Sequence, residues 1–132
     1  MCIAVSSRGP TLDSEVDERF GRCPCFILVD TSSLKFQILD NSSQSEGGGA
    51  GVASAQLIAG SGVEAVLTGN CGPNAFRVLT TGGTKVFTGV SGTVREAIER
   101  YRSGKYAATG GASVDEHFGI AAPESSNKGR TG

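Results

Sequence analysis

The 132-residue sequence lacks several features that define common protein classes. It has no tryptophan and no apolar run approaching the roughly 18 residues of a membrane-spanning helix. It also lacks an excess of either charge, because 12 basic and 13 acidic residues give a formal net charge of -1. Without a basic surface, binding to nucleic acid or to an anionic membrane is not expected. Met1-Cys2-Ile3 carries no sign of a secretion signal, so we expect a soluble, cytoplasmic protein.

Cysteine is also scarce, and the four present (Cys2, Cys23, Cys25 and Cys71) do not indicate a disulfide framework. No secretion signal accompanies them, and a chain of this length can build a core without disulfides, so we expect reduced thiols. The Cys-x-x-Cys pair is missing, which disfavours a self-sufficient ferredoxin or zinc-ribbon site. Glycine, in contrast, is abundant, and its 20 residues are bunched rather than periodic, which is typical of tight turns.

The pattern of apolar residues predicts one α/β domain over residues 1–120, followed by a disordered tail at 121–132. Short apolar or alternating runs predict strands, and small or amphipathic segments that end at glycines predict helices. Pro73 suits a first helical turn, and Thr93 to Glu96 fits a capping box. The expected strands are 2–6, 26–30, 34–40 (half-exposed), 63–68 and 85–88, and the expected helices are 50–59, 73–81 and 94–103.

These elements predict a three-layer α/β/α fold. Residues 31–33 are short enough for a hairpin turn, whereas segment 63–88 has the form of a strand-helix-strand unit with a parallel crossover. We therefore expect a mixed five-stranded sheet of order 3-2-1-4-5 with helices on both faces. The connections diverge between the first and fourth strands, where such sheets leave a crevice, and the turn 69–74 is expected to open onto it.

One loop of the chain combines several reactive groups. Residues 16–26 (Val-Asp-Glu-Arg-Phe-Gly-Arg-Cys-Pro-Cys-Phe) place two thiols and two guanidinium groups in a loop that runs into a buried strand. Residues 114–119 (Val-Asp-Glu-His-Phe-Gly) repeat its first six residues with one change. That change puts the histidine of the sequence, His117, where the first copy has Arg19. We predict that the two copies converge on the same crevice.

Several separated motifs give the sequence a resemblance to a known family. They are Phe20-Gly21-Arg22, Gly47-Gly48-Gly49-Ala50-Gly51, Thr68-Gly69-Asn70-Cys71-Gly72-Pro73-Asn74-Ala75-Phe76 and Gly92-Thr93-Val94-Arg95-Glu96-Ala97. Together they are similar to the dinitrogenase iron-molybdenum cofactor biosynthesis family, which includes NifX and NafY type carriers and the C-terminal part of NifB. The resemblance implies a ribonuclease H-like sheet, as in nitrogenase accessory factors. It also implies a non-catalytic part in binding or delivering an iron-sulfur or iron-molybdenum type cluster or its precursor.

The thiols are the first candidate ligands, because a metal-sulfur cluster needs soft or imidazole-like donors. Cys23 and Cys25 are two residues apart, so in an extended chain both side chains would point to one face and serve one metal. The alternative is that one of them is a small buried hydrophobic residue. Cys71 precedes a helix N-terminus, whose dipole would lower its pKa, although a structural role in the turn is the alternative.

Histidine and arginine complete the candidate set. His117 is a candidate ligand, since some carriers that the sequence resembles use a histidine, but it can equally be a loop histidine with no partner. Relatives often have a histidine where this chain has Arg19, which stays protonated and cannot bind a metal. Arg19 and Arg22 are therefore assigned to offset the charge of an anionic cluster. For Arg19 a salt bridge with Asp17 or Glu18 is the ordinary alternative.

The turn after the fourth predicted strand offers backbone donors. Gly69, Asn70 and Gly72 could cradle an anionic group through their N–H groups, or the glycines could be there because the turn geometry requires them. The glycine run 47–49 is not a phosphate loop, because no Gly-Lys-Ser/Thr follows it. Strand 2–6 carries no carboxylate for Mg²⁺, which excludes the nuclease chemistry of some ribonuclease H-like sheets.

These observations lead to one main hypothesis and two alternatives. The main one is a non-enzymatic carrier of an iron-sulfur or iron-molybdenum type cluster, with a cluster donor or acceptor protein as its partner and a monomeric or weakly self-associating state. The first alternative is a regulatory or protein-interaction domain of the same fold that binds no metal. The second is a pocket for a small molecule or nucleotide at the point where the connections diverge.

Overall fold

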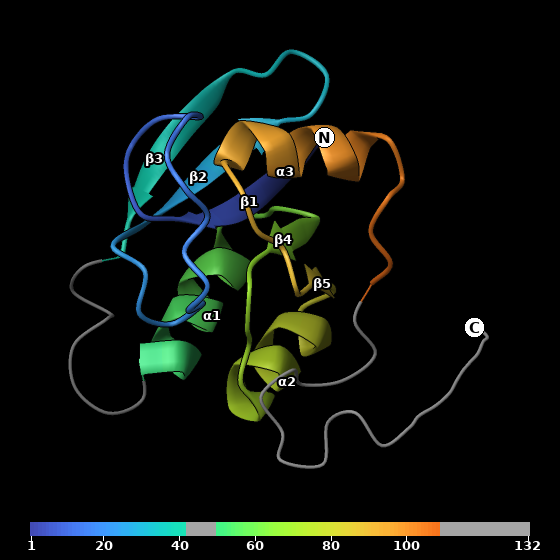
Figure 1. Ribbon diagram of the computed structural model, residues 1–132. Coiled ribbons are helices and arrows are strands. Elements are labelled where there is room, and N and C mark those ends of the chain that lie inside the picture. Colours follow the sequence, from blue (N-terminus) through green and yellow to red (C-terminus); the bar gives the residue numbers. More distant parts are fainter. Residues whose placement is uncertain (42–49, 109–132) are drawn as a thin grey trace.

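The computed structural model describes residues 1–41 and 50–108, in which the chain forms five strands and three helices. In chain order these are β1 (Cys2–Ser7), β2 (Cys25–Asp30), β3 (Phe36–Asp40), α1 (Ala50–Gly60), β4 (Ala65–Leu67), α2 (Pro73–Thr81), β5 (Lys85–Phe87) and α3 (Val94–Arg102) (Figure 1). The strands form one sheet of order β3-β2-β1-β4-β5. β1 pairs antiparallel with β2 and parallel with β4, so the predicted mixed sheet and its order are confirmed.

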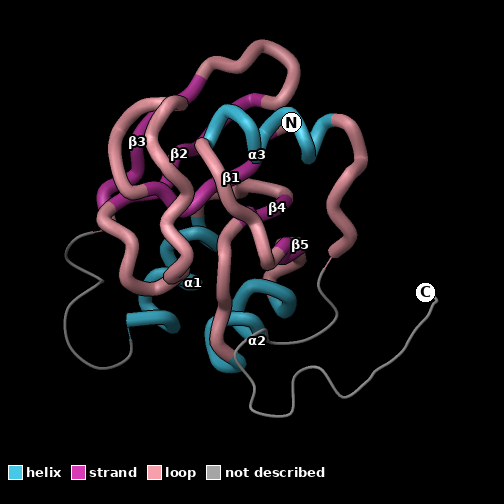
Figure 2. The backbone as a smooth tube through the Cα atoms, in the orientation of Figure 1, coloured by secondary structure: helices cyan, strands magenta, loops and turns pink. Residues whose placement is uncertain are grey.

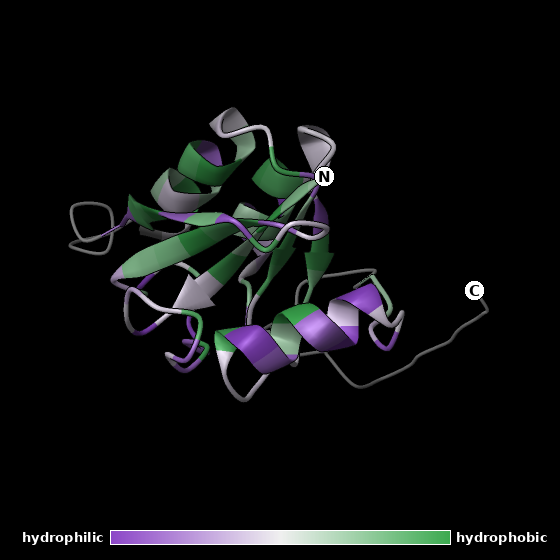
Figure 3. Cartoon of the chain, turned by 90° about the horizontal axis from the view of Figure 1, so that it is seen from above, coloured by the Kyte–Doolittle hydropathy of each residue, from purple (hydrophilic) through white to green (hydrophobic). Residues whose placement is uncertain are grey.

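Helices cover both faces of the sheet, as the three-layer prediction requires. Figures 1 and 3 show α1 and α2 on one face and α3 on the other. Along β1, Ile3 and Val5 belong to the core under α3, whereas Ala4 belongs to the core under α1 and α2. This alternation arises because successive side chains of a strand point to opposite faces. β1 is therefore a central strand that is buried on both sides, and it separates the two cores.

The β2–β3 hairpin forms as predicted, but its second strand starts later. Leu34 adopts a left-handed conformation with φ 63°, so it belongs to the turn and β3 begins at Phe36. Asp30 stabilises this turn, since its Oδ1 accepts hydrogen bonds from the backbone N–H groups of Ser32 (2.9 Å) and Ser33 (3.0 Å). The prediction of a half-exposed strand was wrong, because every residue of β3 except Leu39 is exposed.

The two helix starts predicted from Pro73 and from the Thr93 capping box are present. Pro73 is the first residue of α2, where its missing N–H group breaks no helical hydrogen bond. At the start of α3, Thr93 Oγ1 accepts from Glu96 N (3.1 Å), and Glu96 Oε1 accepts from Thr93 N (2.9 Å). This reciprocal pair is the predicted capping box, and it fixes the point at which α3 leaves the loop.

The long connection between β1 and β2 is tied to distant parts of the chain (Figure 2). Asp17 N donates to Ser6 O (2.9 Å) and Val16 N donates to Gly92 O (2.9 Å). Further along α3, Arg95 N donates to Leu12 O at 2.8 Å. This connection is thus a structured loop, as the motif at residues 16–26 predicted. Among the described residues, no helix has the length and apolar composition needed to cross a membrane.

Candidate functional site

The candidate site lies where the connections after β1 and β4 leave the sheet side by side. β1 and β4 run parallel, with Val5 opposite Leu67, so their carboxyl ends share one edge. From this edge the β1–β2 loop returns across the end of the sheet, while the 68–72 turn leads into α2. Ser6 Oγ lies 2.7 Å from Asp17 O and 2.8 Å from Thr68 Oγ1, all three residues being buried. Buried hydroxyl groups therefore link the two strand ends to the loop above them.

The β1–β2 loop and the 68–72 turn pair directly with each other. Asn70 N donates to Glu18 O at 2.7 Å, and Phe20 N donates to Asn70 O at 3.2 Å. The Phe20 ring is buried and packs on Phe26, with ring centroids 5.2 Å apart. We call the surface formed by residues 18–22 and 69–74 the rim. Within the rim, Arg19 stands opposite Asn70 in an isolated parallel bridge. The rim also includes Arg22 from the first loop and Gly69 and Gly72 from the second.

Gly69 is required by this pairing. A Cβ atom at residue 69 would lie 2.6 Å from Glu18 Cα and 2.9 Å from Glu18 O, distances that real Cβ contacts do not reach. Both backbone groups of Asn70 are used in the pairing, and its side chain is exposed. Gly72 is the N-cap residue of α2 and provides no side-chain acceptor for the N–H groups of the first turn. Of the two interpretations of Gly69, the structural requirement of the turn has direct support.

Arg19 is held in place by Asp17. The Nε and Nη2 atoms of Arg19 donate to the two carboxylate oxygens of Asp17, each at 3.1 Å, and Arg19 N donates to Asp17 Oδ1 at 2.9 Å. Burial would raise the pKa of Asp17, but the hydrogen bonds and charge of Arg19 outweigh it and lower that pKa. The same carboxylate raises the pKa of Arg19. The salt bridge with Asp17 considered from the sequence is therefore present. Arg22 is exposed on the same loop.

Cys23 and Cys25 do not face one side of the chain, so the expectation drawn from their spacing was wrong. Cys23 packs in the core under α1 and α2, and its thiol donates to Phe20 O at 3.3 Å. Cys25 is the first residue of β2, and its side chain is on the same face of the strand as Ile27 and Val29, which belong to the core under α3. Its Sγ lies 3.4 Å from Gly9 O. The rule of alternating sides failed because Cys23 precedes the strand, which starts only at Cys25.

The buried thiols are poor metal ligands as they stand. Burial, with a smaller contribution from the charge of Asp17, raises the pKa of Cys23 to about 12. Burial and the charge of Asp40 raise the pKa of Cys25. Cys71 is 1% exposed, and burial raises its pKa to about 12, so the lowered pKa predicted from the helix dipole was wrong. Metal-ligating thiols must be deprotonated, and these are thiols at neutral pH.

Two buried polar residues that the sequence analysis missed fix the loop around Cys23. Asn41 Nδ2 donates to Cys23 O at 2.8 Å, and Asn41 Oδ1 accepts from Ser54 Oγ at 2.9 Å. Ser54 lies in α1, and its Oγ is also 3.3 Å from Gly21 O. Asn41 opens a polar, glycine-rich segment of the sequence, a context that gives no indication of burial. The useful signal was its position directly after β3, where a polar side chain can reach the neighbouring loop.

His117 lies outside the described residues, and so does the whole second copy of the motif at 114–119. The predicted convergence of the two copies stays a prediction. Within residues 1–41 and 50–108, no three His, Cys, Asp or Glu side chains are grouped to hold a metal ion. The described part of the rim thus offers positive charge and the uncapped first turn of α2 rather than a set of metal ligands. The N–H group of Asn70, a predicted donor to an anion, donates to Glu18 O instead.

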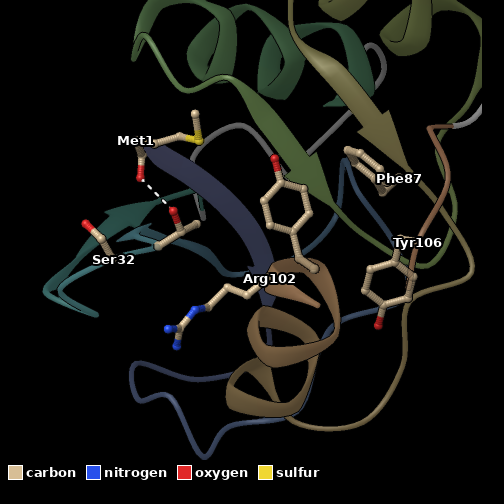
Figure 4. Close-up of a pocket in the computed structure, with 7 residues that line it drawn as sticks. Met1, Ser32, Phe87, Arg102 and Tyr106 are labelled. Atoms are coloured by element: carbon tan, nitrogen blue, oxygen red, sulfur yellow. Dashed lines mark hydrogen bonds between the residues drawn. The ribbon is translucent and has the colours of Figure 1, made fainter. Parts of the chain in front are cut away.

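A separate open pocket of about 530 Å³ lies on the α3 side of the sheet (Figure 4). It is lined by Met1, Thr31, Ser32, Phe87, Tyr101, Arg102 and Tyr106. The Phe87 and Tyr101 rings meet edge to face, 5.3 Å apart, and Tyr101 Oη donates to Glu64 Oε2 at 2.9 Å. None of the candidate site residues in the described ranges lines this pocket, so it is distinct from the crevice that the strand order predicted.

Comparison with known proteins extends the sequence resemblance. Residues 1–104 match the profile of the protein family described as dinitrogenase iron-molybdenum cofactor. The uncharacterised protein MJ0580 of Methanocaldococcus jannaschii is 30% identical over 99 residues, which cover 73% of this chain and 84% of that protein.

Solved structures share the fold. The apo form of the orange protein from Desulfovibrio gigas is 39% identical, with a TM-score of 0.81 over 84% of this chain and 94% of that one. A protein from Thermotoga that has been described as a candidate NifB protein is 34% identical, with a TM-score of 0.70 over 81% of this chain and 91% of that one. The order of strands argued from the sequence is thus that of a known structural group.

Proposed function

Because this chain belongs to the dinitrogenase iron-molybdenum cofactor family, we propose that it is a non-catalytic carrier of a metal-sulfur cluster. The cargo is an iron-sulfur or iron-molybdenum type cluster, or a precursor of one, that a donor protein supplies and an acceptor protein receives. The rim of residues 18–22 and 69–74 is the proposed binding site for this cluster. The observation that carries the proposal is the pairing of Glu18 and Phe20 with Asn70, which holds the arginine-bearing loop against the start of α2.

The chemistry of the rim supports a cluster that is held by charge more than by protein thiolates. A cluster that brings its own sulfides can be anionic, and then needs cationic and N–H donors around it. Arg19, oriented by Asp17, and Arg22, exposed on the same loop, supply the cations. The first turn of α2 has no side-chain cap, so its N–H groups and dipole also favour an anion.

The cysteines fit this proposal as supports of the loop. Direct ligation by Cys23 or Cys71 would require deprotonation of a thiol whose pKa is raised to about 12 and an opening of the core around it. His117, which the family resemblance made a candidate ligand, would contribute from outside the described residues. We therefore expect cargo binding to depend on Arg22, Arg19 and His117 more than on Cys23.

The alternative function, a regulatory or protein-interaction domain that binds no metal, draws support from one observation. The described residues contain no group of three ligands, and all three thiols near the rim are buried. A family member that had lost its cargo would look the same in these respects. Loading experiments separate the two functions.

The test is anaerobic reconstitution of the full chain with iron and sulfide, with and without molybdate, followed by desalting, metal analysis and visible absorbance. The carrier proposal expects retained metal in the parent, at least about tenfold less in Arg22→Gln and His117→Ala, and little change in Cys23→Ser. Arg102→Gln, an exposed arginine on α3, is the matched control for loss of one charge. A parent protein that retains no metal would leave the metal-free alternative.

A further inference from the structure

The edge strand β3 carries an unusual pair of exposed side chains. β3 is the outermost strand of the sheet on its side, next to β2. Phe36 is 43% exposed and Ile38 is 42% exposed, and with Met1 they are the large hydrophobic residues in the described ranges that are left exposed. Apolar side chains on a sheet edge are a template for pairing with another strand.

Phe36 and Ile38 lie on the same face of the sheet. In the antiparallel register they stand opposite Val29 and Ile27, and both of these belong to the core under α3. The two exposed side chains therefore continue the apolar surface of that core past its last covered strand. On the other face of β3, Gln37 and Leu39 alternate with them.

The backbone of the same two residues faces outward. Asp30 N donates to Lys35 O at 2.9 Å, and Asn41 N donates to Pro24 O at 2.9 Å. The backbone groups of Lys35 and Asn41, which flank β3, therefore point toward β2. In an antiparallel ladder these alternate with residues that direct their N–H and C=O groups away. Phe36 and Ile38 thus present backbone donors and acceptors at the edge. Within the described residues no strand pairs with that edge.

We propose that β3 pairs antiparallel with the β3 strand of a second copy of this chain, about a two-fold axis at Gln37. The axis must be perpendicular to the sheet, so that the α3 face of one copy continues into the α3 face of the other. In this register Phe36 of each copy stands opposite Ile38 of the second copy, and both backbone groups of each residue are paired. Pairs of an aromatic with a β-branched side chain stabilise adjacent strands.

The strand is complementary to itself, which favours a second copy over an unrelated partner. Each copy supplies the ring and the branched side chain that the other needs. A shift of the axis to Ile38 would set Phe36 against the charged Asp40 of the second copy, so the Gln37 register is preferred. β3 also contains no proline or bulge that would block pairing. Its charged residues lie at the two ends, with Lys35 just before the strand and Asp40 as its last residue. An interface of two short strands is small, so the dimer is reversible.

Cysteine cross-linking tests the register directly, in a Cys2→Ser background that removes the exposed native thiol. With the axis at Gln37, the two copies of residue 37 form a non-hydrogen-bonded pair with Cα atoms about 4.5 Å apart. The two copies of residue 35 are four positions apart along the strands, about 13 Å, beyond the reach of a disulfide. Under mild oxidation Gln37→Cys should form a disulfide-linked dimer at least about tenfold faster than the matched Lys35→Cys control. Equal rates, or no cross-linking of either, would overturn the proposal.

Sedimentation provides the second measurement, because it requires no new thiol. The mean mass of the full chain should rise between about 10 µM and about 1 mM, as expected for weak association. Ile38→Lys should abolish this rise, whereas Gln56→Lys, at an exposed position on α1, should leave it unchanged. Circular dichroism would verify that both variants fold. A mass that stays monomeric throughout, or that Ile38→Lys does not alter, would contradict pairing through β3.

Discussion

The carboxylate of Asp17 holds the guanidinium of Arg19 through two hydrogen bonds, and the two side chains differ widely in exposure. The Asp17 side chain is 1% exposed and that of Arg19 is 59% exposed. The buried carboxylate fixes one edge of the guanidinium, while the rest of the group stays in solvent at the rim. Asp17 also accepts from Arg19 N, so it shapes the backbone of the loop as well. Stability and site geometry at the rim therefore depend on the same residue.

Replacement of Asp17 by asparagine should destabilise the fold. An amide has one oxygen, so it can accept only one of the two hydrogen bonds that Arg19 donates to Asp17. The buried amide nitrogen would then face a donor and stay without a hydrogen bond. We expect Asp17→Asn to lower the free energy of unfolding by about 1–3 kcal/mol. The control Asp13→Asn should cost clearly less, because that carboxylate is exposed and solvent screens its pairing with Arg95. Urea unfolding measures both, and equal losses would mean that the buried carboxylate has no special role.

The stabilising effect of Asp17 should also depend on pH. Its pKa in the folded state is lowered from the ordinary value of 3.8, so the folded protein favours the ionised form. For a lowered pKa, the contribution is fully present above the unfolded value and is lost as pH falls through the folded value. The difference in unfolding free energy between the parent and Asp17→Asn should be constant from pH 7 to about pH 5 and should shrink below about pH 4. A difference that grows on acidification would contradict this assignment.

The four cysteines should divide by accessibility. Cys2 is exposed, whereas Cys23, Cys25 and Cys71 are buried. At pH 8 in native buffer, we expect Ellman's reagent to titrate one thiol rapidly and the other three only as slowly as the structure opens. Cys2→Ser should remove the fast phase, and all four thiols of the parent should react at once in denaturant. A second fast thiol that disappears in Cys71→Ser would restore the activation by the helix dipole that burial argues against.

Local patterns in the sequence were sufficient for most of the fold. The apolar run of β2 and the alternation of β3 predicted the hairpin. The Thr93 capping box predicted the residue at which α3 starts. What could not be predicted depends on contacts between distant segments. The pairing of Glu18 with Asn70 joins residues about fifty positions apart, and it alone explains why Gly69 has no side chain.

Burial was the other property that local patterns did not provide. Cys71 stands before a helix, and that position alone predicts a lowered pKa. Its thiol is instead enclosed by the core under α1 and α2, where desolvation outweighs the helix dipole. Asp17 likewise sits among charged neighbours in sequence, yet it is the buried member of its ion pair. A single residue pattern cannot distinguish a solvated charge from one that folding encloses.

Gly69→Ala tests the pairing that forms the rim. The added Cβ would lie 2.6 Å from Glu18 Cα, so the β1–β2 loop or the 68–72 turn must move. We expect the free energy of unfolding to fall by about 1–3 kcal/mol. The matched control is Gly60→Ala at the end of α1, where a Cβ meets nothing within 4 Å and the substitution should be neutral or slightly stabilising. Hydrogen exchange adds a local measurement, because Asn70 N donates to Glu18 O at 2.7 Å and should lose protection selectively in Gly69→Ala. If both variants are as stable as the parent and the amide of Asn70 stays protected from exchange, the two loops do not approach each other this closely. The rim is then not a fixed surface.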